Sequence, residues 1–217
     1  MGYKKSVPQP LFIAIDGIDG CGKSTQTRLL YDFFKEHNIE CLLTKEPGGG
    51  LEETIRTLLL NPSVNVNAIT ETLLFFADRV EHMEKKIIPS IKQGISVISD
   101  RFIASTYAYQ VFGRKVDLPF VDFLRINTIN RLPDITVIID IPTSVAMERT
   151  YKSCIRDESR FENMGSSFYK RVTSGFDWYL NNFDNVYKVD GNRHVSEVFT
   201  DIKGILSPLL SLDSEHF

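Results

Sequence analysis

A short glycine-rich motif constrains the fold of this chain more than any other feature. Residues 17–24 read GIDGCGKS and directly follow an apolar run at 11–16. The motif has the form G-x-x-x-x-G-K-[ST], which predicts a strand that enters a tight turn and then opens a helix. Glycines let several backbone N–H groups of the turn point at one anion, and the start of the helix adds the positive end of its dipole.

The side chains of this phosphate-binding loop indicate the ligand. Lys23 brings a full charge to terminal phosphates, and the Ser24 hydroxyl is a suitable ligand for Mg²⁺. We therefore predict that the loop binds a nucleoside triphosphate with Mg²⁺; a glycine-rich turn without a ligand is the alternative. The residues expected to line this site are Gly17, Ile18, Asp19, Gly20, Cys21, Gly22, Lys23, Ser24 and Thr25.

Composition limits the partners of the chain. Its 217 residues, 42% hydrophobic and 24% charged, suffice for one large α/β domain with a substantial core. A formal net charge of −3 gives no overall basic field, so we expect no nucleic acid partner. Small anionic substrates would then depend on individual arginines.

Cysteine usage and hydropathy bear on the compartment. Cys21, Cys41 and Cys154 are too few and too dispersed for a disulfide framework or metal site, so we expect a reduced, cytoplasmic protein. No apolar run approaches the ~20 residues of a membrane span. Residues 1–10 lack the apolar stretch of a signal peptide and are expected to form a disordered tail before one domain at 11–217.

Five short apolar runs alternate with helical patterns along the chain. The runs predict strands at 11–16, 40–44, 95–99, 135–141 and 186–189. The helical patterns cover 24–38, 51–60, 69–92, 117–131, 144–151, 162–182 and 195–210. This alternation predicts an α/β fold with a mostly parallel sheet between helical layers. Ligands of such sheets bind beyond the carboxyl ends of the strands.

Two clusters follow the second expected strand. Glu46, Pro47 and three glycines make a shaped loop, and Arg56 in the next helix is expected to face the same cleft; a plain connecting turn is the alternative. Phe75 and Arg79 are four residues apart, so they share a helix face that is able to hold a base and a phosphate. Core packing for Phe75 and a surface ion pair for Arg79 are the alternative.

The third strand ends in Asp100 and Arg101. A carboxylate there is placed to organise Mg²⁺ and its water shell, and the guanidinium to hold phosphoryl oxygens. The alternative is an Asp–Arg pair that serves only itself. Asp140 at the next strand end competes for the metal role, but Pro142 soon after it favours a plain strand terminus.

A basic segment lies at about 149–162, with the sequence RTYKSCIRDESRFE. It joins two predicted helices and contains few apolar residues. We predict a mobile lid above the triphosphate, whose arginines neutralise charge during phosphoryl transfer. A solvated charged run is the alternative.

Four motifs together resemble the bacterial type of the thymidylate kinase family. They are G-x-D-G-x-G-K-S-T, E-P-G-G, F-x-A-D-R and D-R-x-x-x-S-x-x-A-Y-Q, in this order, and the resemblance runs from about residue 11 to about 205. It implies a three-layer P-loop NTPase fold with a five-stranded parallel sheet, a homodimer, and phosphoryl transfer from ATP with Mg²⁺ to dTMP, on the route to dTTP.

The resemblance also implies residue roles. Catalytic roles fall to Lys23, Arg160, Asp19 and Arg101, and metal binding to Ser24 and Asp100. The residues expected to bind dTMP are Asp19, Glu46, Pro47, Arg56, Phe75, Arg79, Arg101, Ser105, Thr106, Tyr109 and Gln110. Among them, Phe75 would stack on thymine, Arg79 contact the base, and Arg56 and Arg101 hold the acceptor phosphate.

Three positions depart from the common family pattern. Lys45 stands where Arg often precedes E-P-G-G, and Ser159 precedes Arg160 in the lid. The loop has no basic residue between Asp19 and Gly22, and family members with such a neutral loop take their catalytic arginine from the lid, which points to Arg160. The remaining alternatives are a kinase for another pyrimidine monophosphate such as dUMP, and a non-catalytic nucleotide-binding module.

Overall fold

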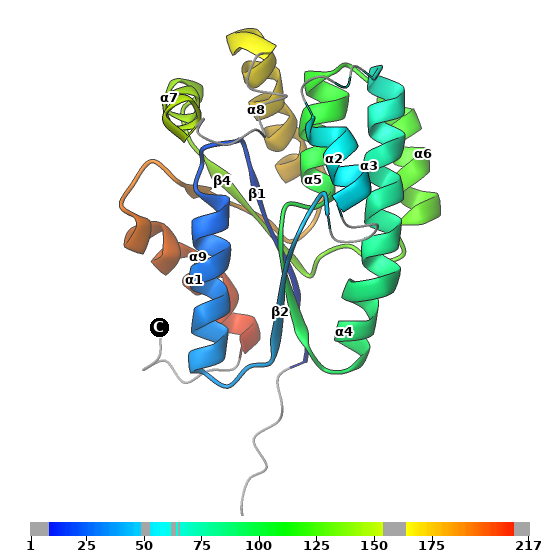
Figure 1. Ribbon diagram of the computed structural model, residues 1–217. Helices are drawn as coiled ribbons and strands as arrows, with labels where there is room; N and C mark the ends of the chain where they lie inside the picture. Colours follow the sequence, from blue (N-terminus) through cyan, green and yellow to red (C-terminus); the bar gives the residue numbers. More distant parts are fainter. Residues whose placement is uncertain (1–8, 49–52, 62–63, 65, 154–163, 211–217) are drawn as a thin grey trace, which may run out of the picture.

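A parallel five-stranded sheet forms the centre of the molecule in the computed structural model (Figure 1). The structure describes all residues except 1–8, 49–52, 62–63, 65, 154–163 and 211–217. The strands are β1 (Phe12–Gly17), β2 (Cys41–Lys45), β3 (Ser96–Asp100), β4 (Ile135–Asp140) and β5 (Val186–Asp190). Their order is β2-β3-β1-β4-β5, and every neighbouring pair is parallel. The predicted α/β fold and five-stranded parallel sheet are confirmed.

Helices cover both faces of the sheet. Figure 1 shows α1 (Lys23–Glu36) and α9 (Val195–Leu210) on one side. On the other side lie α2 (Glu53–Leu60), α3 (Ala68–His82), α4 (Ile88–Lys92), α5 (Ile103–Thr106) and α6 (Leu118–Thr128). The helices α7 (Thr143–Ser153) and α8 (Gly165–Asn182) separate β4 from β5 along the chain. The central strands β1 and β4 are almost wholly buried, as expected for strands covered on both faces.

Strand register brings the charged strand ends to one edge of the sheet. Asp100 pairs in register with both Ile15 and Lys45, and Gly17 pairs with Ile139. The phosphate-binding loop therefore begins beside the carboxyl ends of β3 and β4. This edge is where an open parallel sheet binds its ligands.

The helix predicted at 69–92 has the right extent but is not regular. Asn67 caps its start, because the Asn67 side chain accepts a hydrogen bond of 2.8 Å from the Thr70 N–H. After α3 the helix widens into a π-helical segment, η1 (Met83–Ile87), before α4. Pro89 lies in the first turn of α4 and has no N–H to donate to a preceding carbonyl, which explains an irregular turn just before it.

A helical segment was missed between β3 and α6. Residues 103–113 fold into the short α5 and a second π-helical segment, η2 (Tyr107–Gly113). Ala108, Tyr109 and Gln110 are all buried, so the segment has no polar face to reveal its period. Helix α8 packs closely on it: a Cβ on Gly175 would lie 2.6 Å from the Ala108 Cα.

The other boundaries differ from the predictions by a few residues. The strands sit about one residue later than most of the predicted runs, and α6 ends at Thr128 rather than at residue 131 because Ile129 turns to an extended conformation. Helix α7 continues to Ser153, so the first residues of the predicted lid are helical. The rest of that lid and residues 1–8 of the tail predicted at 1–10 lie outside the described residues.

Candidate active site

The phosphate-binding loop has the tight shape that its glycines permit. Gly17 has a φ of +142°, and a Cβ at this position would meet the Ile139 carbonyl oxygen at 2.4 Å. Gly22 precedes α1 with a left-handed φ of 97°. Both positions exclude other residues, because an L side chain rarely adopts these angles and Gly17 also lacks space.

Lys23 folds back over the loop. Its Nζ donates a 2.9 Å hydrogen bond to the Ile18 carbonyl and lies 3.9 Å from Asp19 Oδ1. The charged group is thus held against the loop that the motif predicts to bind a triphosphate. Thr25, the last predicted residue of the loop, is exposed in the first turn of α1.

Ser24 and Asp100 meet at the predicted metal position. The Ser24 hydroxyl donates a 2.6 Å hydrogen bond to Asp100 Oδ2. Both groups are hard oxygen donors beside the loop, and Mg²⁺ commonly takes one or two protein oxygens together with phosphates and waters. Within the described ranges, no group of three or more His, Cys, Asp or Glu side chains is arranged to hold a metal ion. The pair therefore fits a Mg²⁺ that arrives with a nucleotide. Asp140, the competing carboxylate, lies 2.8 Å from Lys188.

Asp19 is the meeting point of the loop with β3 and η2. It forms a short ion pair with the Arg101 guanidinium, and Tyr109 donates a 2.7 Å hydrogen bond to its Oδ2. Burial opposes its charge, but Arg101 and Lys23 outweigh burial and hold the pKa of Asp19 below its ordinary value. Burial and the Asp19 charge raise the pKa of Tyr109, so the phenol stays protonated and donates.

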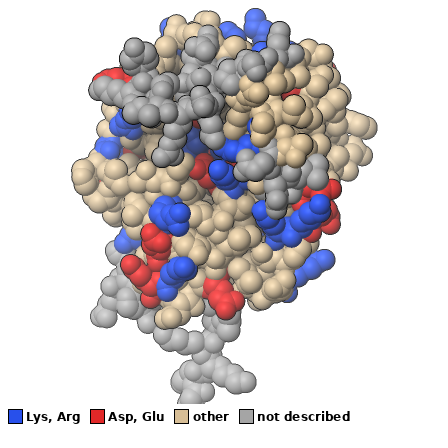
Figure 2. Space-filling view, in the orientation of Figure 1, with Lys and Arg blue, Asp and Glu red and all other residues tan. Residues whose placement is uncertain are grey.

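Arg101 does not pair with Asp100, so the alternative of a self-contained Asp–Arg pair is wrong. Its Nη1 donates to the Gly17 carbonyl at 3.0 Å and to the Ser105 hydroxyl at 2.8 Å, while Nη2 reaches Asp19. Among the described residues, Nε–H has no hydrogen-bond acceptor, so the guanidinium keeps a donor for an incoming anion. Figure 2 shows basic and acidic side chains together in the middle of this face.

Asp16 is a site residue that the predicted set left out. Its side chain is fully buried and accepts hydrogen bonds from the Ser105 hydroxyl and, at 3.0 Å, from the Phe102 N–H. Burial raises the pKa of Asp16 to about 6, although the bond from Ser105 and the Arg101 charge oppose the shift. Its place at the carboxyl end of β1 was the available signal in the sequence.

A second buried cluster surrounds Glu46 after β2. The Arg79 Nε lies 2.7 Å from Glu46 Oε2, and the His82 Nδ1 lies 3.0 Å from Glu46 Oε1. The other His82 nitrogen lies 2.8 Å from the Thr44 hydroxyl. Arg79 is only 2% exposed, so the alternative of a surface ion pair for it is wrong. The Arg79 charge can be buried because Glu46, 33 positions away on another element, pairs with it.

Loop residues 46–48 are fixed between α2 and α3. Arg56 donates a 2.6 Å hydrogen bond to the Pro47 carbonyl, and the Gly48 N–H donates to Asp78 Oδ2 at 3.0 Å. Arg56 therefore reaches the loop as predicted from its position in the next helix. Asp78 was not predicted, and it shows how α3 orients this loop.

Helix α3 and segment η2 face each other beyond Arg79. Phe75 is partly buried on α3, and Thr106 and Gln110 are buried on the opposite side. Gln110 Nε2 donates a 3.0 Å hydrogen bond to Glu71 Oε1 on α3. Glu71 was not predicted, although it lies four residues before Phe75 and so shares its helix face.

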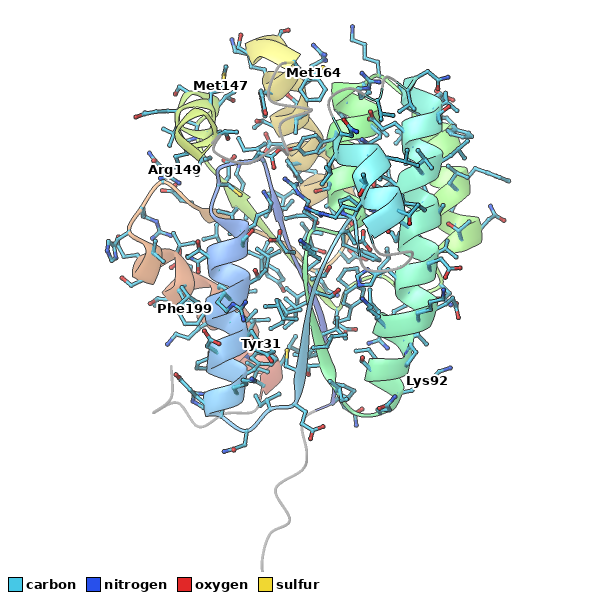
Figure 3. The ribbon with its side chains drawn as sticks, viewed as in Figure 1. Tyr31, Lys92, Met147, Arg149, Met164 and Phe199 are labelled. Carbon is cyan, nitrogen blue, oxygen red and sulfur yellow. The ribbon has the colours of Figure 1, made fainter. Side chains whose placement is uncertain are left out.

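The basic lid is described only at its beginning. Arg149 on α7 lies above the amino-terminal end of α1 (Figure 3), and its Nη1 is 3.5 Å from the Gly20 carbonyl of the loop. Gly49, Arg156 and Arg160 lie outside the described residues. No helix in the described part of the chain is both long and apolar enough to cross a membrane.

Comparisons with known proteins cover nearly the whole chain. The sequence profile described as Thymidylate kinase matches residues 15–202. A protein named thymidylate kinase from Carboxydothermus hydrogenoformans is 42% identical over 200 residues, 91% of this chain and 97% of that protein. One of the same name from Neisseria meningitidis serogroup B is 36% identical over 204 residues, with the same coverage. The crystal structure of thymidylate kinase from Ehrlichia chaffeensis has a TM-score of 0.74 and 34% identity, covering 92% of this chain and 100% of that one.

The titration of Asp16 predicts a pH dependence of stability. Its pKa is about 6 in the folded state against 3.8 for the ordinary group, so the folded state binds the extra proton between these values. A raised acid pKa gives stability that is present at low pH and lost as the pH rises through about 6. Relative to Asp16→Asn, we expect the wild type to lose about 2 kcal/mol of unfolding free energy between pH 4 and pH 7.

Urea unfolding at several pH values between 4 and 7 measures this difference. The matched control is Asp32→Asn, an exposed aspartate on α1, whose stability curve should run parallel to that of the wild type. A parallel curve for Asp16→Asn would show that Asp16 titrates normally in the folded protein.

Proposed function

The chain belongs to the thymidylate kinase family, and from this premise we propose that it transfers the γ-phosphoryl group of ATP to dTMP. The products are dTDP and ADP, on the route to dTTP. The observation that carries the proposal is the family match over residues 15–202. The phosphate-binding loop and the clustered arginines beside it supply the groups that such a reaction needs.

Phosphoryl transfer of this kind depends on positioning and charge. The acceptor is a phosphate oxygen that is already ionised at neutral pH, so no strong general base is needed. Lys23 holds the terminal phosphates of ATP, and Arg101 and Arg56 hold the acceptor phosphate against its repulsion from ATP. Arg160 from the lid neutralises charge on the moving group. The ion pair of Arg101 with Asp19 supports this arrangement, because it keeps the guanidinium beside the loop.

The metal site consists of the Ser24 hydroxyl and the Asp100 carboxylate. Their separation of 2.6 Å supports a shared oxygen site for Mg²⁺. When bound there with the nucleotide, Mg²⁺ neutralises phosphate charge. Asp100 also fixes the Ser24 hydroxyl at the start of α1.

The acceptor base binds between α3 and η2. Phe75 stacks on the thymine ring, while Arg79 and Gln110 contact its polar edge. The sugar and phosphate are lined by Ser105, Thr106, Tyr109 and Asp19. Glu46 and Pro47, which follow β2, form the wall of the pocket on that side. The burial of Arg79 and Gln110 supports this, because groups shielded from water discriminate bases strongly.

A homodimer forms through α3 and α6. Ile69 and Leu73 on α3 are exposed, as are Phe123 and Ile126 on α6, the latter two at 64% and 65%. The two helices pack against each other (Figure 1), and each of them carries exposed apolar side chains that a second copy would cover. A monomer gains nothing from exposing such side chains, whereas a second copy would bury them.

The cytoplasm is the compartment that we propose. Cys21 and Cys41, the two cysteines in the described part of the chain, are free thiols. Thiols persist in this state where the medium is reducing.

A panel of acceptors tests the proposed reaction. Release of ADP in the presence of ATP and Mg²⁺ is measured with dTMP, dUMP, dCMP, AMP and GMP. We expect dTMP to give the highest kcat/KM, with bases of the wrong hydrogen-bond pattern slower by about tenfold or more. EDTA should abolish the reaction and added Mg²⁺ restore it. Equal rates across the panel would contradict a thymidylate kinase.

Arg160→Ala tests the lid. An arginine that stabilises the transferring phosphoryl group is worth ~10³-fold or more in rate, so kcat should fall on that scale. Arg131→Ala is the control, because Arg131 pairs with Asp134, which binds the first residue of β1 at the far end of the sheet. If the two variants turn over at similar rates, Arg160 has no part in the transfer.

Light scattering tests the dimer. The wild type should show twice the mass of the chain, and Phe123→Glu with Ile126→Glu should reduce it to one chain, since charges are costly in an apolar interface. Leu209→Glu introduces the same charge at an exposed leucine on α9 and should leave the dimer intact. If the wild type has the mass of a single chain, the proposed dimer interface is wrong.

A further inference from the structure

We propose that Glu71 is a positioning residue that fixes the orientation of the Gln110 amide, so that the base pocket accepts thymine or uracil and rejects cytosine. The inference rests on the function proposed above, because it assumes that the base binds between α3 and η2. It assigns to Glu71 the choice between the two pyrimidine hydrogen-bond patterns.

Glu71 lies on the same face of α3 as the residues that border the base pocket. Glu71, Phe75 and Arg79 follow one another at intervals of four residues and form one stripe along the helix. Opposite this stripe, η2 brings Gln110 to Glu71, with 3.0 Å between Nε2 and Oε1. Glu71 is 0% exposed and Gln110 only 2%, so water does not replace this bond.

The bond to Glu71 leaves the amide only one orientation. An ionised carboxylate accepts hydrogen bonds and donates none, so the NH₂ end of Gln110 must face Glu71. The carbonyl end of the amide then points away from Glu71, and Oε1 makes no hydrogen bond with any described residue. Arg114 Nε, 3.5 Å from Glu71 Oε1, balances the buried negative charge. Gln110 thus presents an acceptor to whatever binds beside it.

Arg79 supplies the complementary donor. Its Nε is engaged by Glu46, and its Nη2 lies 3.4 Å from the Phe102 carbonyl. Its Nη1 is buried and has no partner among the residues that the structure describes. A buried donor without a partner costs free energy, which a ligand oxygen would recover.

This donor and acceptor match one pyrimidine pattern only. Thymine and uracil present N3–H as a donor and O4 as an acceptor, whereas cytosine presents N3 as an acceptor and its exocyclic amine as a donor. Arg79 matches O4, and Gln110 Oε1 matches N3–H. A flipped Gln110 amide would offer N–H to cytosine N3, and Glu71 prevents that flip.

Glu71→Gln tests the inference, since it keeps the size of the side chain but no longer forces one amide orientation. The sharpest substrate pair is dTMP and 5-methyl-dCMP, which share the methyl group and differ only at the N3 and C4 positions. We expect the kcat/KM ratio of dTMP over 5-methyl-dCMP to fall by about tenfold or more. The ratio of dTMP over dUMP should stay within about twofold, because the methyl pocket is unchanged.

Two further variants complete the test. Glu84→Gln makes the same chemical change at an exposed site just after α3 and should leave both ratios as in the wild type. The reciprocal exchange Glu71→Gln with Gln110→Glu again places an acceptor toward the base and should restore the preference for dTMP. If Glu71→Gln alone does not fold, this double variant still tests the role of Glu71.

The outcomes separate the inference from the proposed function. If Glu71→Gln slows dTMP and 5-methyl-dCMP by the same factor, Glu71 is only structural and the inference is overturned. A reciprocal variant that prefers 5-methyl-dCMP would also overturn it. Failure of the wild type to phosphorylate dTMP or dUMP would instead overturn the proposed function itself.

Discussion

The ion pair between Asp19 and Arg101 joins the parts of the site that the chain keeps far apart. Asp19 belongs to the loop after β1, and Arg101 follows β3. The same guanidinium donates to the Gly17 carbonyl and to Ser105, and Tyr109 of η2 donates to the same carboxylate. The pair is partly buried, and the hydrogen bonds around it link the loop, β3 and η2 to one another.

The backbone at Arg101 shows how strongly this junction is fixed. Arg101 has a φ of 73°, a left-handed conformation that costs an ordinary residue about 1–2 kcal/mol. Such strain persists only where surrounding contacts fix the backbone, and it clusters at functional sites. Here the Arg101 N–H donates to the Ile15 carbonyl while the side chain turns back to the loop. This backbone conformation directs the guanidinium toward Asp19 and Gly17 in the loop.

Much of the fold follows from local patterns in the sequence. The phosphate-binding loop is encoded in eight consecutive residues, and continuous apolar runs locate the buried strands to within about one residue. The strand-end rule also brings Ser24 to Asp100 and Asp19 to Arg101. What could not be predicted depends on long-range packing. The segment 103–113 is buried on nearly all sides and so has no period, and Arg79 is buried only because Glu46 approaches from another element.

The π-helical turn of η2 explains how one segment contacts both the phosphate-binding loop and α3. Its wide turn, in which the Arg114 N–H donates to the Tyr109 carbonyl, lets consecutive side chains reach partners on different elements. Tyr109 points to Asp19 in the loop, whereas Gln110 points to Glu71 on α3. The phosphate-binding loop and α3 are therefore linked through this backbone. Helix α8 sets its position, because Gly175 leaves no space between α8 and Ala108. A shift of α8 would consequently move both contacts together, which makes this packing as important to the site as the residues that line it.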